Sequence, residues 1–319
     1  MPWSLGSAVA PEQSHVTIET LRLRGSGGEV VAEVNPVGAG IRSLSVDGVD
    51  LVQGYSGDRP PAMAGTVLVP WPNRIDRGRW ELNGETQQLE ITEPQLDSAT
   101  HGLLSTARYL TQRRTESSLT FEAGISGHAG YPFELQTEVG YQLLDGGIEA
   151  TQRITNSGGR PAPVAIGAHP YLRVGDVDAN DLAVRIRAMT TVLLDERNLP
   201  TFDQDVSGTR YDLRNSVSVR DVVSHACFTG LELTNGRHEL SLIAPDGRET
   251  VVWGDENFRW AQLYVTDAFP RGGGFVTAVA LEPMTAPPNS LASGTGLHWI
   301  EPGDTWIVRW GIELRTTAR

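Results

Sequence analysis

Two ionisable residues, His169 and Glu282, stand next to proline at the ends of apolar segments. The run TAVAL (277–281) is typical of a buried strand and leads into Glu282, while PVAIGA (163–168) leads into His169. Because proline has no backbone N–H for a central ladder, each strand is predicted to stop at this point. Two such strand ends could aim a carboxylate and an imidazole into one cleft. The alternative is that the two strand ends are unrelated and simply reach solvent.

Two further polar clusters could bind a ligand. In the segment VLVPWPNRIDRGRWEL (67–82), two prolines flank Trp71, and Asn73 and Arg74 follow. Rigid proline and a flat indole are a common way to present polar groups to a sugar, although Arg74 could equally pair with an acid in a stiff structural loop. His101 lies at a predicted loop-to-strand boundary. A lone histidine is more often structural than a ligand, so this cluster is a weak indication by itself.

The composition excludes several kinds of chemistry. The chain contains no lysine, so its 26 basic residues are all arginine, and neither Schiff-base catalysis nor a Walker lysine is available. A single cysteine, Cys227, allows no internal disulfide and no cysteine-based metal site. The 7 histidines form no H-x-H or H-E-x-x-H motif, no Rossmann glycine motif opens a helix, and G-x-S-x-G does not occur. We therefore expect neither a metal nor a cofactor.

Charge and hydropathy restrict the partners and the location. The formal net charge is −13, which disfavours a nucleic-acid partner because phosphate binding needs a basic surface. No apolar run approaches the roughly 20 residues of a membrane helix, so no membrane partner is expected. Residues 1–15 lack the basic and apolar regions of a signal peptide, and we expect a cytoplasmic protein. The sequence is silent about the oligomeric state.

The elements that must position these residues are predicted to be strands. Alternation with period 2 is clearest in the segments 15–23, 29–34, 118–125, 182–188, 240–245 and 305–315. Pairs that favour tight hairpins, with glycine in second place, begin at Asp47, Asn83, Asp145, Asn235 and Asp246. Residues 133–155 read as one long hairpin, and no long amphipathic helix is evident. We predict an all-β fold, a large antiparallel β-sandwich forming one domain over residues 1–319, with residues 1–14 loosely ordered.

Taken in order along the chain, four segments resemble the aldose 1-epimerase, or galactose mutarotase, family. They are PWPNRIDRGRW (70–80), HGLLSTARY (101–109), GAHPYL (167–172) and LEPMTAPPNSL (281–291). Each is moderately specific, but four in this order form a strong resemblance over about residues 15–315, and the Pro-Trp-Pro-Asn-Arg loop is similar to that of a bacterial branch. The resemblance implies a β-supersandwich that interconverts the α and β anomers of an aldose, with a sugar as its partner and no cofactor.

The same resemblance implies a catalytic pair. Glu282 would be the general base that takes the proton of the anomeric hydroxyl, and His169 the general acid that protonates the ring oxygen as its bond to C1 breaks. The open aldehyde would rotate about C1–C2 and reclose. We expect a resting pair of carboxylate and imidazolium, because the ordinary pKa values of glutamate and histidine, about 4.3 and 6.5, leave a narrow window that a nearby carboxylate widens upward.

The resemblance also implies sugar-binding residues: Arg74 and His101 for hydroxyls, Asn73 to shape their loop, and Tyr171 in the cleft wall. The family usually has a sugar-binding aspartate in the region that matches DVVSHACFTGL (221–231). In this chain His225 stands nearest to that place, and Asp221 lies a few residues upstream. His225 either replaces the aspartate or is a bystander.

Three other functions remain open from the residues alone. A glycoside hydrolase would need a second carboxylate, for which Asp255 is a candidate. A non-catalytic sugar-binding protein would use Arg74, His101 and the tryptophans for binding only. An epimerase for an anionic sugar, such as a phosphate or sulfonate, would use arginines, and Arg74, Arg77 and Arg271 are candidate contacts.

Overall fold

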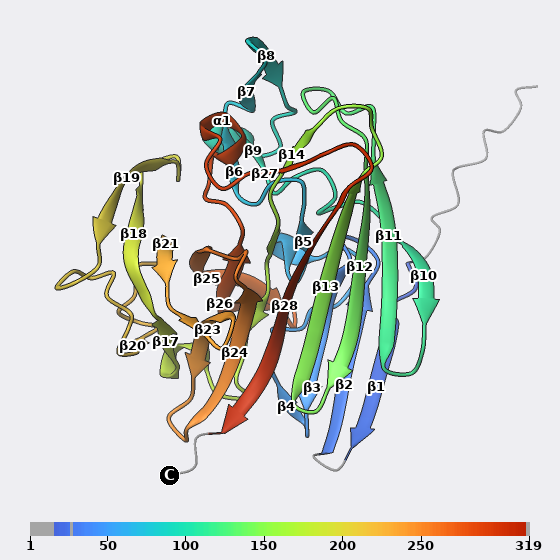
Figure 1. Cartoon of the computed structure of the whole chain (residues 1–319). Coiled ribbons are helices and arrows are strands. Elements are labelled where there is room, and N and C mark those ends of the chain that lie inside the picture. The colour runs from blue at the N-terminus through green and yellow to red at the C-terminus, as the bar shows by residue number, and fades with distance from the viewer. Residues whose placement is uncertain (1–15, 26–27, 317–319) are drawn as a thin grey trace, which may run out of the picture.

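Antiparallel strands form nearly all of the regular structure in the computed structural model, which describes residues 16–25 and 28–316 (Figure 1). Within these residues the helical elements are α1 (Ser290–Ser293) and the 3-10 turns η1 (Pro61–Met63), η2 (Pro94–Leu96) and η3 (Ala179–Asp181). None of the described helices is long and apolar enough to cross a membrane. The predicted all-β antiparallel fold is therefore confirmed. The prediction that residues 1–14 are loosely ordered lies outside the described residues.

The largest sheet has ten strands, and its centre is the last long strand of the chain. In sheet order the strands are β10 (Leu110–Arg114), β11 (Ser118–Ile125), β12 (Leu135–Leu144), β13 (Gly147–Asn156), β28 (Thr305–Thr316), β24 (Arg248–Asp255), β23 (Arg237–Ile243), β17 (Ala183–Ile186) and β20 (Val217–Ser218), with β22 (Leu233–Thr234) paired to β23. Every second side chain of β12 is buried, from Leu135 to Leu143. This alternation leaves one face of the sheet on the core and one in solvent.

The second main sheet has eight strands and carries most of the residues discussed below. In sheet order they are β19 (Pro200–Asp205), β18 (Ala188–Leu194), β21 (His225–Leu231), β25 (Trp260–Arg271), β26 (Gly274–Met284), β15 (Gly167–Ala168) and β5 (Val67–Leu68), with β16 (Tyr171–Leu172) also paired to β26. All side chains of β26 from Ala278 to Met284 are buried. This half of β26 is therefore covered on both faces, which explains its continuous apolar run.

Smaller sheets complete the architecture. They are the four-stranded sheet of β1 (Glu19–Gly25), β2 (Gly28–Asn35), β3 (Gly40–Val46) and β4 (Val49–Asp50), and the pairs β6 (Arg74–Asp76) with β9 (Ser98–Thr100), β7 (Arg79–Leu82) with β8 (Glu85–Gln88), and β14 (Ala162–Val164) with β27 (His298–Ile300). Strands β1 to β3 pack against β12 and β13, and β26 packs against β23 and β24. The largest hydrophobic cluster has members from Leu21 to Ile312, and the single domain stays a prediction.

All five predicted turn pairs lie between paired strands. For example, Asn83-Gly84 joins β7 to β8, and Asp145-Gly146 joins β12 to β13 in the long hairpin expected over residues 133–155. The glycine of each pair has a positive φ, such as 81° at Gly84, which glycine adopts without a steric penalty. One strand prediction needs correction, because the segment 182–188 contains all of β17, a break at Arg187 and the first residue of β18.

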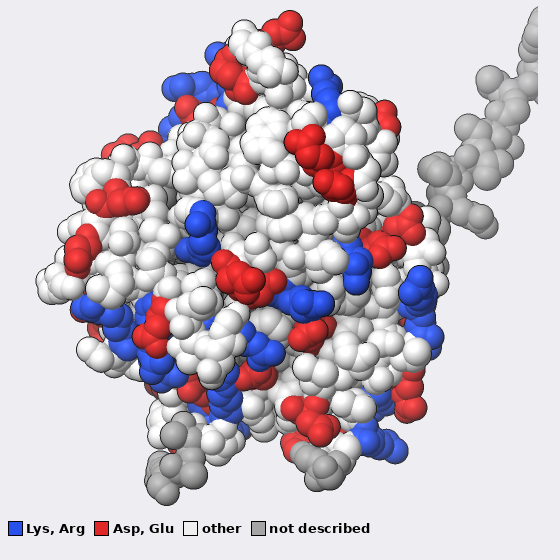
Figure 2. Space-filling model, in the orientation of Figure 1, with Lys and Arg blue, Asp and Glu red and all other residues white. Residues whose placement is uncertain are grey.

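Charged side chains are mixed over the surface. Figure 2 shows arginine and acidic side chains interspersed on the face in view. Many of them pair, as Arg315 does with Glu239 at 2.6 Å. Because such exposed pairs contribute little to stability, their main effect is a hydrated surface of mixed charge.

Candidate functional site

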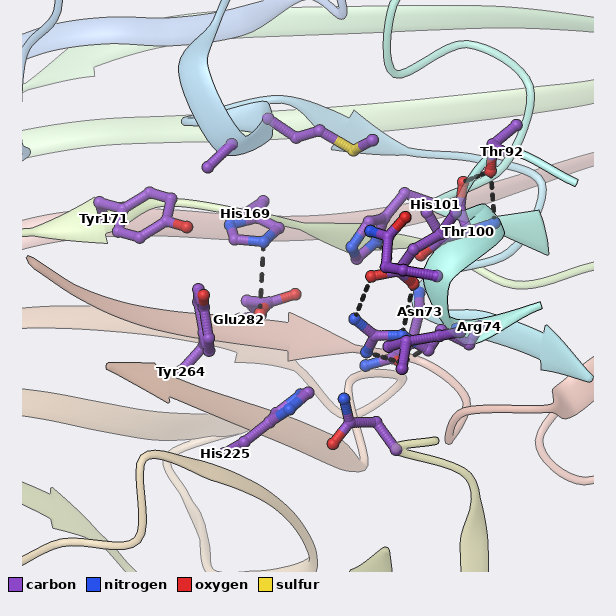
Figure 3. A pocket seen from close by; sticks show the side chains of 16 residues that line it. Asn73, Arg74, Thr92, Thr100, His101, His169, Tyr171, His225, Tyr264 and Glu282 are labelled. Carbon is purple, nitrogen blue, oxygen red and sulfur yellow. Dashed lines mark hydrogen bonds and ion pairs between the residues drawn. The ribbon is translucent and has the colours of Figure 1, made fainter. Parts of the chain in front are cut away.

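A pocket of about 440 Å³ contains all seven residues predicted from the sequence (Figure 3). Its lining residues are Ala62, Met63, Asn73, Arg74, Thr92, Glu93, Gln95, Leu96, Thr100, His101, His169, Tyr171, Asn198, His225, Tyr264 and Glu282. In Figure 3, His169 and Glu282 face each other near the centre, with Asn73, Arg74 and His101 on one side and Tyr171 on the other. The fold thus brings together segments that lie more than 200 residues apart in the chain.

Glu282 lies inside a strand rather than at its end. Strand β26 continues through Pro283 to Met284, and Glu282 is opposite Gln262 of β25. The prediction that the strand stops at Glu282 is therefore wrong by two residues, because the backbone of Pro283 still aligns with Ala261 without donating a hydrogen bond. The side chain of Glu282 is 3% exposed, so it has a rigid mount but little contact with water.

His169 occupies the position predicted for it. Strand β15 stops at Ala168, directly before His169-Pro170. The backbone N–H of His169 donates to the carbonyl of Thr66, and its carbonyl accepts from Gly65, so the residue is held on both sides. Its ring stacks on Tyr171 at a centroid distance of 5.1 Å. The imidazole is therefore fixed with Nε2 directed at Glu282, 3.5 Å from Oε1.

Burial decides where the proton of this pair resides. Loss of hydration raises the pKa of Glu282 to about 8, against a smaller lowering by Arg74. The pKa of His169 is lowered to about 4, mainly by loss of hydration, with smaller lowering contributions from Arg74 and His225 that a hydrogen bond at its own backbone opposes. The predicted pair of carboxylate and imidazolium is thus contradicted, because at neutral pH each group is more stable uncharged where water is excluded. Between the two pKa values the pair still carries one dissociable proton.

Two hydrogen bonds with Asn73, one from the backbone of His101 and one to its side chain, position His101. The N–H of His101 donates to the carbonyl of Asn73 at 2.9 Å, and the N–H of Asn73 donates to Nδ1 of His101 at 3.2 Å. Since Nδ1 is the acceptor, Nε2 carries the proton and is available to donate. Burial lowers the pKa of His101 well below its usual value, which keeps the ring neutral. His101 follows strand β9, so the predicted loop-to-strand boundary is a strand-to-loop boundary.

Asn73 also forms a hydrogen bond to β25, the strand that pairs with the strand of Glu282. Its Nδ2 donates to Oε1 of Gln262 at 3.2 Å, and Gln262 is the cross-strand partner of Glu282. Its φ of 58° lies in the left-handed region, which asparagine tolerates better than most residues. The loop of Asn73 is therefore tied directly to the centre of the pocket, as a residue that shapes the loop would be.

Arg74 lines the pocket but does not stand free in it. Its Nε and Nη2 donate to the two carboxylate oxygens of Glu93 at 2.6 and 2.9 Å. Both side chains are mostly buried, with 13% and 16% of their surface exposed. The pairing with an acid is therefore observed, while the ligand-binding role of Arg74 stays a prediction for a residue that lines the pocket. Glu93 itself was not predicted, because no local pattern marks it.

His225 takes a place in the pocket wall, whereas Asp221 does not line the pocket. His225 begins β21 and lies opposite Tyr264 of β25, and the centroids of the two rings are 5.5 Å apart. Burial, with a contribution from Arg74, lowers the pKa of His225 to about 4. A neutral imidazole therefore stands near the region where the family usually has an aspartate.

The pocket holds buried polar atoms that no described group satisfies. They include Glu282 Oε2, Tyr171 OH and Thr100 Oγ1. Buried polar atoms normally have a hydrogen-bond partner. All three residues line this one pocket. Tyr264 also lines this hollow and was missed, because no motif in the strand segment around it marks it.

Several other sequence-based candidates lie outside the pocket lining. Trp71 is 1% exposed and packs against Tyr131 at 6.1 Å between centroids, so it does not present its indole to a sugar. Asp255 accepts hydrogen bonds from Asn257 and Arg309 in its own region of the sheet. Arg77 pairs with Asp76, and Arg271 is at the tip of the β25–β26 hairpin. Within the described residues no group of three or more His, Cys, Asp or Glu could hold a metal ion.

The chain belongs to the aldose 1-epimerase family, whose model matches residues 20–312. It is 30% identical over 291 residues to the uncharacterized protein YihR of Escherichia coli (strain K12), and the match covers 91% of each chain. A GalM/aldose epimerase homologue from C. elegans has a TM-score of 0.81 at 16% identity, covering 95% of this chain and 100% of the other. A galactose mutarotase-like protein from Clostridium acetobutylicum has a TM-score of 0.76 at 18% identity, covering 96% and 100%. The predicted galactose mutarotase-like fold is confirmed.

Proposed function

We propose that the protein is an aldose 1-epimerase, an isomerase that interconverts the α and β anomers of an aldose. The observation that carries the proposal is the facing pair of His169 and Glu282, 3.5 Å apart and buried in the wall of the pocket. Opening a sugar ring needs one group to take a proton and another to give one, and no oxidant is consumed. Membership of the aldose 1-epimerase family supports the same reaction.

In the proposed mechanism the pair acts with its single proton. With that proton on His169 Nε2, the carboxylate of Glu282 takes the proton of the anomeric hydroxyl while the imidazolium protonates the ring oxygen. The C1–O5 bond breaks, the aldehyde rotates about C1–C2, and the reverse transfers close the ring on the other face. Substrate hydroxyls that hydrogen-bond to Glu282 would favour its charged form and promote this proton arrangement.

Residues around the pair would hold the sugar. The free Nε2–H of His101 and the remaining Nη1 of Arg74 are donors for hydroxyl oxygens. Tyr171 OH, which has no partner in the described structure, can both donate and accept. We assign His225 the place of the family's aspartate as a neutral hydroxyl partner.

The test is the rate of mutarotation in the Glu282→Gln variant. Freshly dissolved α-D-glucose and α-D-galactose are followed by polarimetry with wild type and variant at equal concentration. We expect wild type to accelerate the approach to equilibrium and the variant to lose about 10²–10⁴-fold in kcat, because an amide cannot take the proton. The matched control is Glu256→Gln, which makes the same substitution at a described residue that does not line the pocket.

Other outcomes separate the competing functions. A variant as fast as wild type would contradict the role of Glu282 as base. A wild type that binds sugar but leaves the spontaneous rate unchanged would indicate a non-catalytic binding protein. Release of the aryl alcohol from an aryl glycoside would indicate a hydrolase, which the proposed function does not predict.

A further inference from the structure

The ion pair of Arg74 and Glu93 determines the charge that a ligand meets in the pocket. Of the lining residues, only three are acidic or carry a guanidinium group, namely Arg74, Glu93 and Glu282. Glu93 accepts two hydrogen bonds from Arg74, and burial holds the pKa of Glu282 at about 8. The pocket is therefore close to electrically neutral at pH 7, although it contains an arginine.

The geometry of the pair leaves the guanidinium poorly placed to bind an anion. Nε and Nη2 of Arg74 are both used by Glu93, while Nη1 lies 3.5 Å from Oδ1 of Asn73. A substrate anion at Nη1 would share the arginine with a carboxylate and face its negative charge at short range. A neutral hydroxyl oxygen can accept a hydrogen bond from the same Nη1 without this repulsion.

Glu93 is also held firmly in the pocket wall. Its backbone N–H donates to the carbonyl of Ser98, and its own carbonyl accepts from Leu96, within the turn that contains η2. Arg197, from the distant β18–β19 connection, donates to the carbonyls of Leu96 and Asp97. These contacts fix the backbone that carries Glu93, and its carboxylate is held by the two hydrogen bonds from Arg74, so making room for an anion would require breaking that pair.

We propose that Glu93 determines the substrate class by charge: it neutralises Arg74, so that the pocket accepts neutral aldoses and rejects sugars that carry a carboxylate, phosphate or sulfonate. This inference rests on the proposed function, since it concerns the specificity of the same site. It also sets aside the anionic-sugar alternative, for which two of the three candidate arginines, Arg77 and Arg271, lie outside the described pocket lining.

The experiment compares D-glucose with D-glucuronate, which differ by a carboxylate at C6. Mutarotation of both is measured for wild type, Glu93→Gln, Glu93→Asp and Glu90→Gln. Glu93→Gln removes the charge and keeps the size, Glu93→Asp keeps the charge and shortens the side chain, and Glu90→Gln removes a charge from an exposed residue outside the pocket lining. The readout is the ratio of kcat/KM for glucuronate to kcat/KM for glucose.

We expect wild type to prefer glucose, and Glu93→Gln to raise the ratio about tenfold or more, because an unpaired guanidinium makes charge-assisted hydrogen bonds to a carboxylate. Glu93→Asp should keep the low ratio even if its overall activity falls, and Glu90→Gln should leave the ratio unchanged. A merely structural Glu93 would lower both kcat/KM values together without changing their ratio, which would overturn the inference. A wild type that prefers glucuronate would overturn it as well.

Two further measurements keep the outcome decisive. If Glu93→Gln does not fold, KM of the wild-type enzyme is measured for both sugars at rising salt concentration. Because salt screens repulsion between charges, KM for glucuronate should fall while KM for glucose stays unchanged. Equal responses of the two KM values contradict the inference. If wild type accelerates neither sugar, the proposed function fails. The same comparison is then made on binding by ligand-observed NMR, where equal or absent binding of both sugars by wild type overturns the specificity inference independently.

Discussion

Exclusion of water gives His169 and Glu282 pKa values that neither would have at a surface. The change moves the two values in opposite directions, to about 4 for His169 and about 8 for Glu282. With ordinary pKa values, glutamate at about 4.3 and histidine at about 6.5, such a pair holds one proton only between about pH 4.3 and pH 6.5. Burial therefore widens the range in which the pair holds one proton, although it places that proton on the carboxyl group.

This arrangement predicts a bell-shaped pH profile for kcat/KM. Activity should fall as pH drops through about 4, where His169 takes up a second proton for the pair, and as pH rises through about 8, where Glu282 loses the last one. Polarimetry over this range, corrected for spontaneous mutarotation in buffer, measures both limbs as properties of the coupled pair. A rate that keeps rising above pH 9 would show that no proton of the pair is needed.

At the scale of elements, the site combines long paired strands, which carry Glu282, Tyr264 and His225, with short strands whose ends carry His101 and His169. His101 follows the three-residue strand β9, and His169 lies between the two-residue strands β15 and β16. Their backbones leave the extended conformation at once, as the φ of 61° at His101 shows. Such interruptions turn side chains toward the hollow from one side, while Glu282 and Tyr264 reach it from the paired strands β26 and β25.

Gly102 tests this local geometry. A Cβ at Gly102 would lie 2.1 Å from the carbonyl oxygen of Val69, and its φ is 73°. We expect Gly102→Ala to displace His101 and the Asn73 loop, raising KM for the sugar and lowering the free energy of unfolding by about 2–4 kcal/mol. Urea denaturation and steady-state polarimetry measure the two effects.

Gly84→Ala provides the matched control. Gly84 has a similar φ of 81°, but its Cβ would meet no atom within 4 Å. It should therefore show only the cost of the left-handed backbone, about 1 kcal/mol, with KM unchanged. If the two variants behave alike, the close approach to Val69 does not position the site.

At the scale of the whole molecule, β28 joins the two halves of the largest sheet. Its residue Ile312 lies opposite Ile148 of β13 and Val252 of β24 and is fully buried. Strands from residues 110–156 and from residues 237–255 therefore become one sheet only when the last strand of the described chain is added. The pocket depends on this closure, since β26 packs on β23 and β24.

We expect Ile312→Ala to lower the free energy of unfolding by about 2–5 kcal/mol, because it removes three carbons from a closed core site. At a temperature where the variant is folded, kcat per folded molecule should stay at the wild-type value, since Ile312 is not part of the pocket lining. Leu144→Ala, at a side chain that is 43% exposed, should cost less than about 0.5 kcal/mol. A drop in kcat without loss of stability would show that core packing tunes the site directly.

Local chemistry made the strands and hairpins predictable. A turn such as Asn83-Gly84 needs only its own two residues to adopt positive φ, and alternation along β12 records which face is buried. The seven candidate residues were also predictable, because their motifs occur in a recognisable order along the chain. Each of these features depends on residues that are close together in the sequence, so it can be predicted without knowing which distant segments come into contact.

Contacts between distant segments decided the rest. Glu93 reaches Arg74 across 19 residues, Trp71 is buried against Tyr131, and Glu282 lies opposite Gln262 in a strand covered on both faces. The residue types alone suggested a charged acid–base pair and an indole that faces the ligand, and the structure contradicts both expectations. The physical reason is that burial is a property of how sheets stack, and burial sets hydration, which in turn sets the charge of each ionisable group.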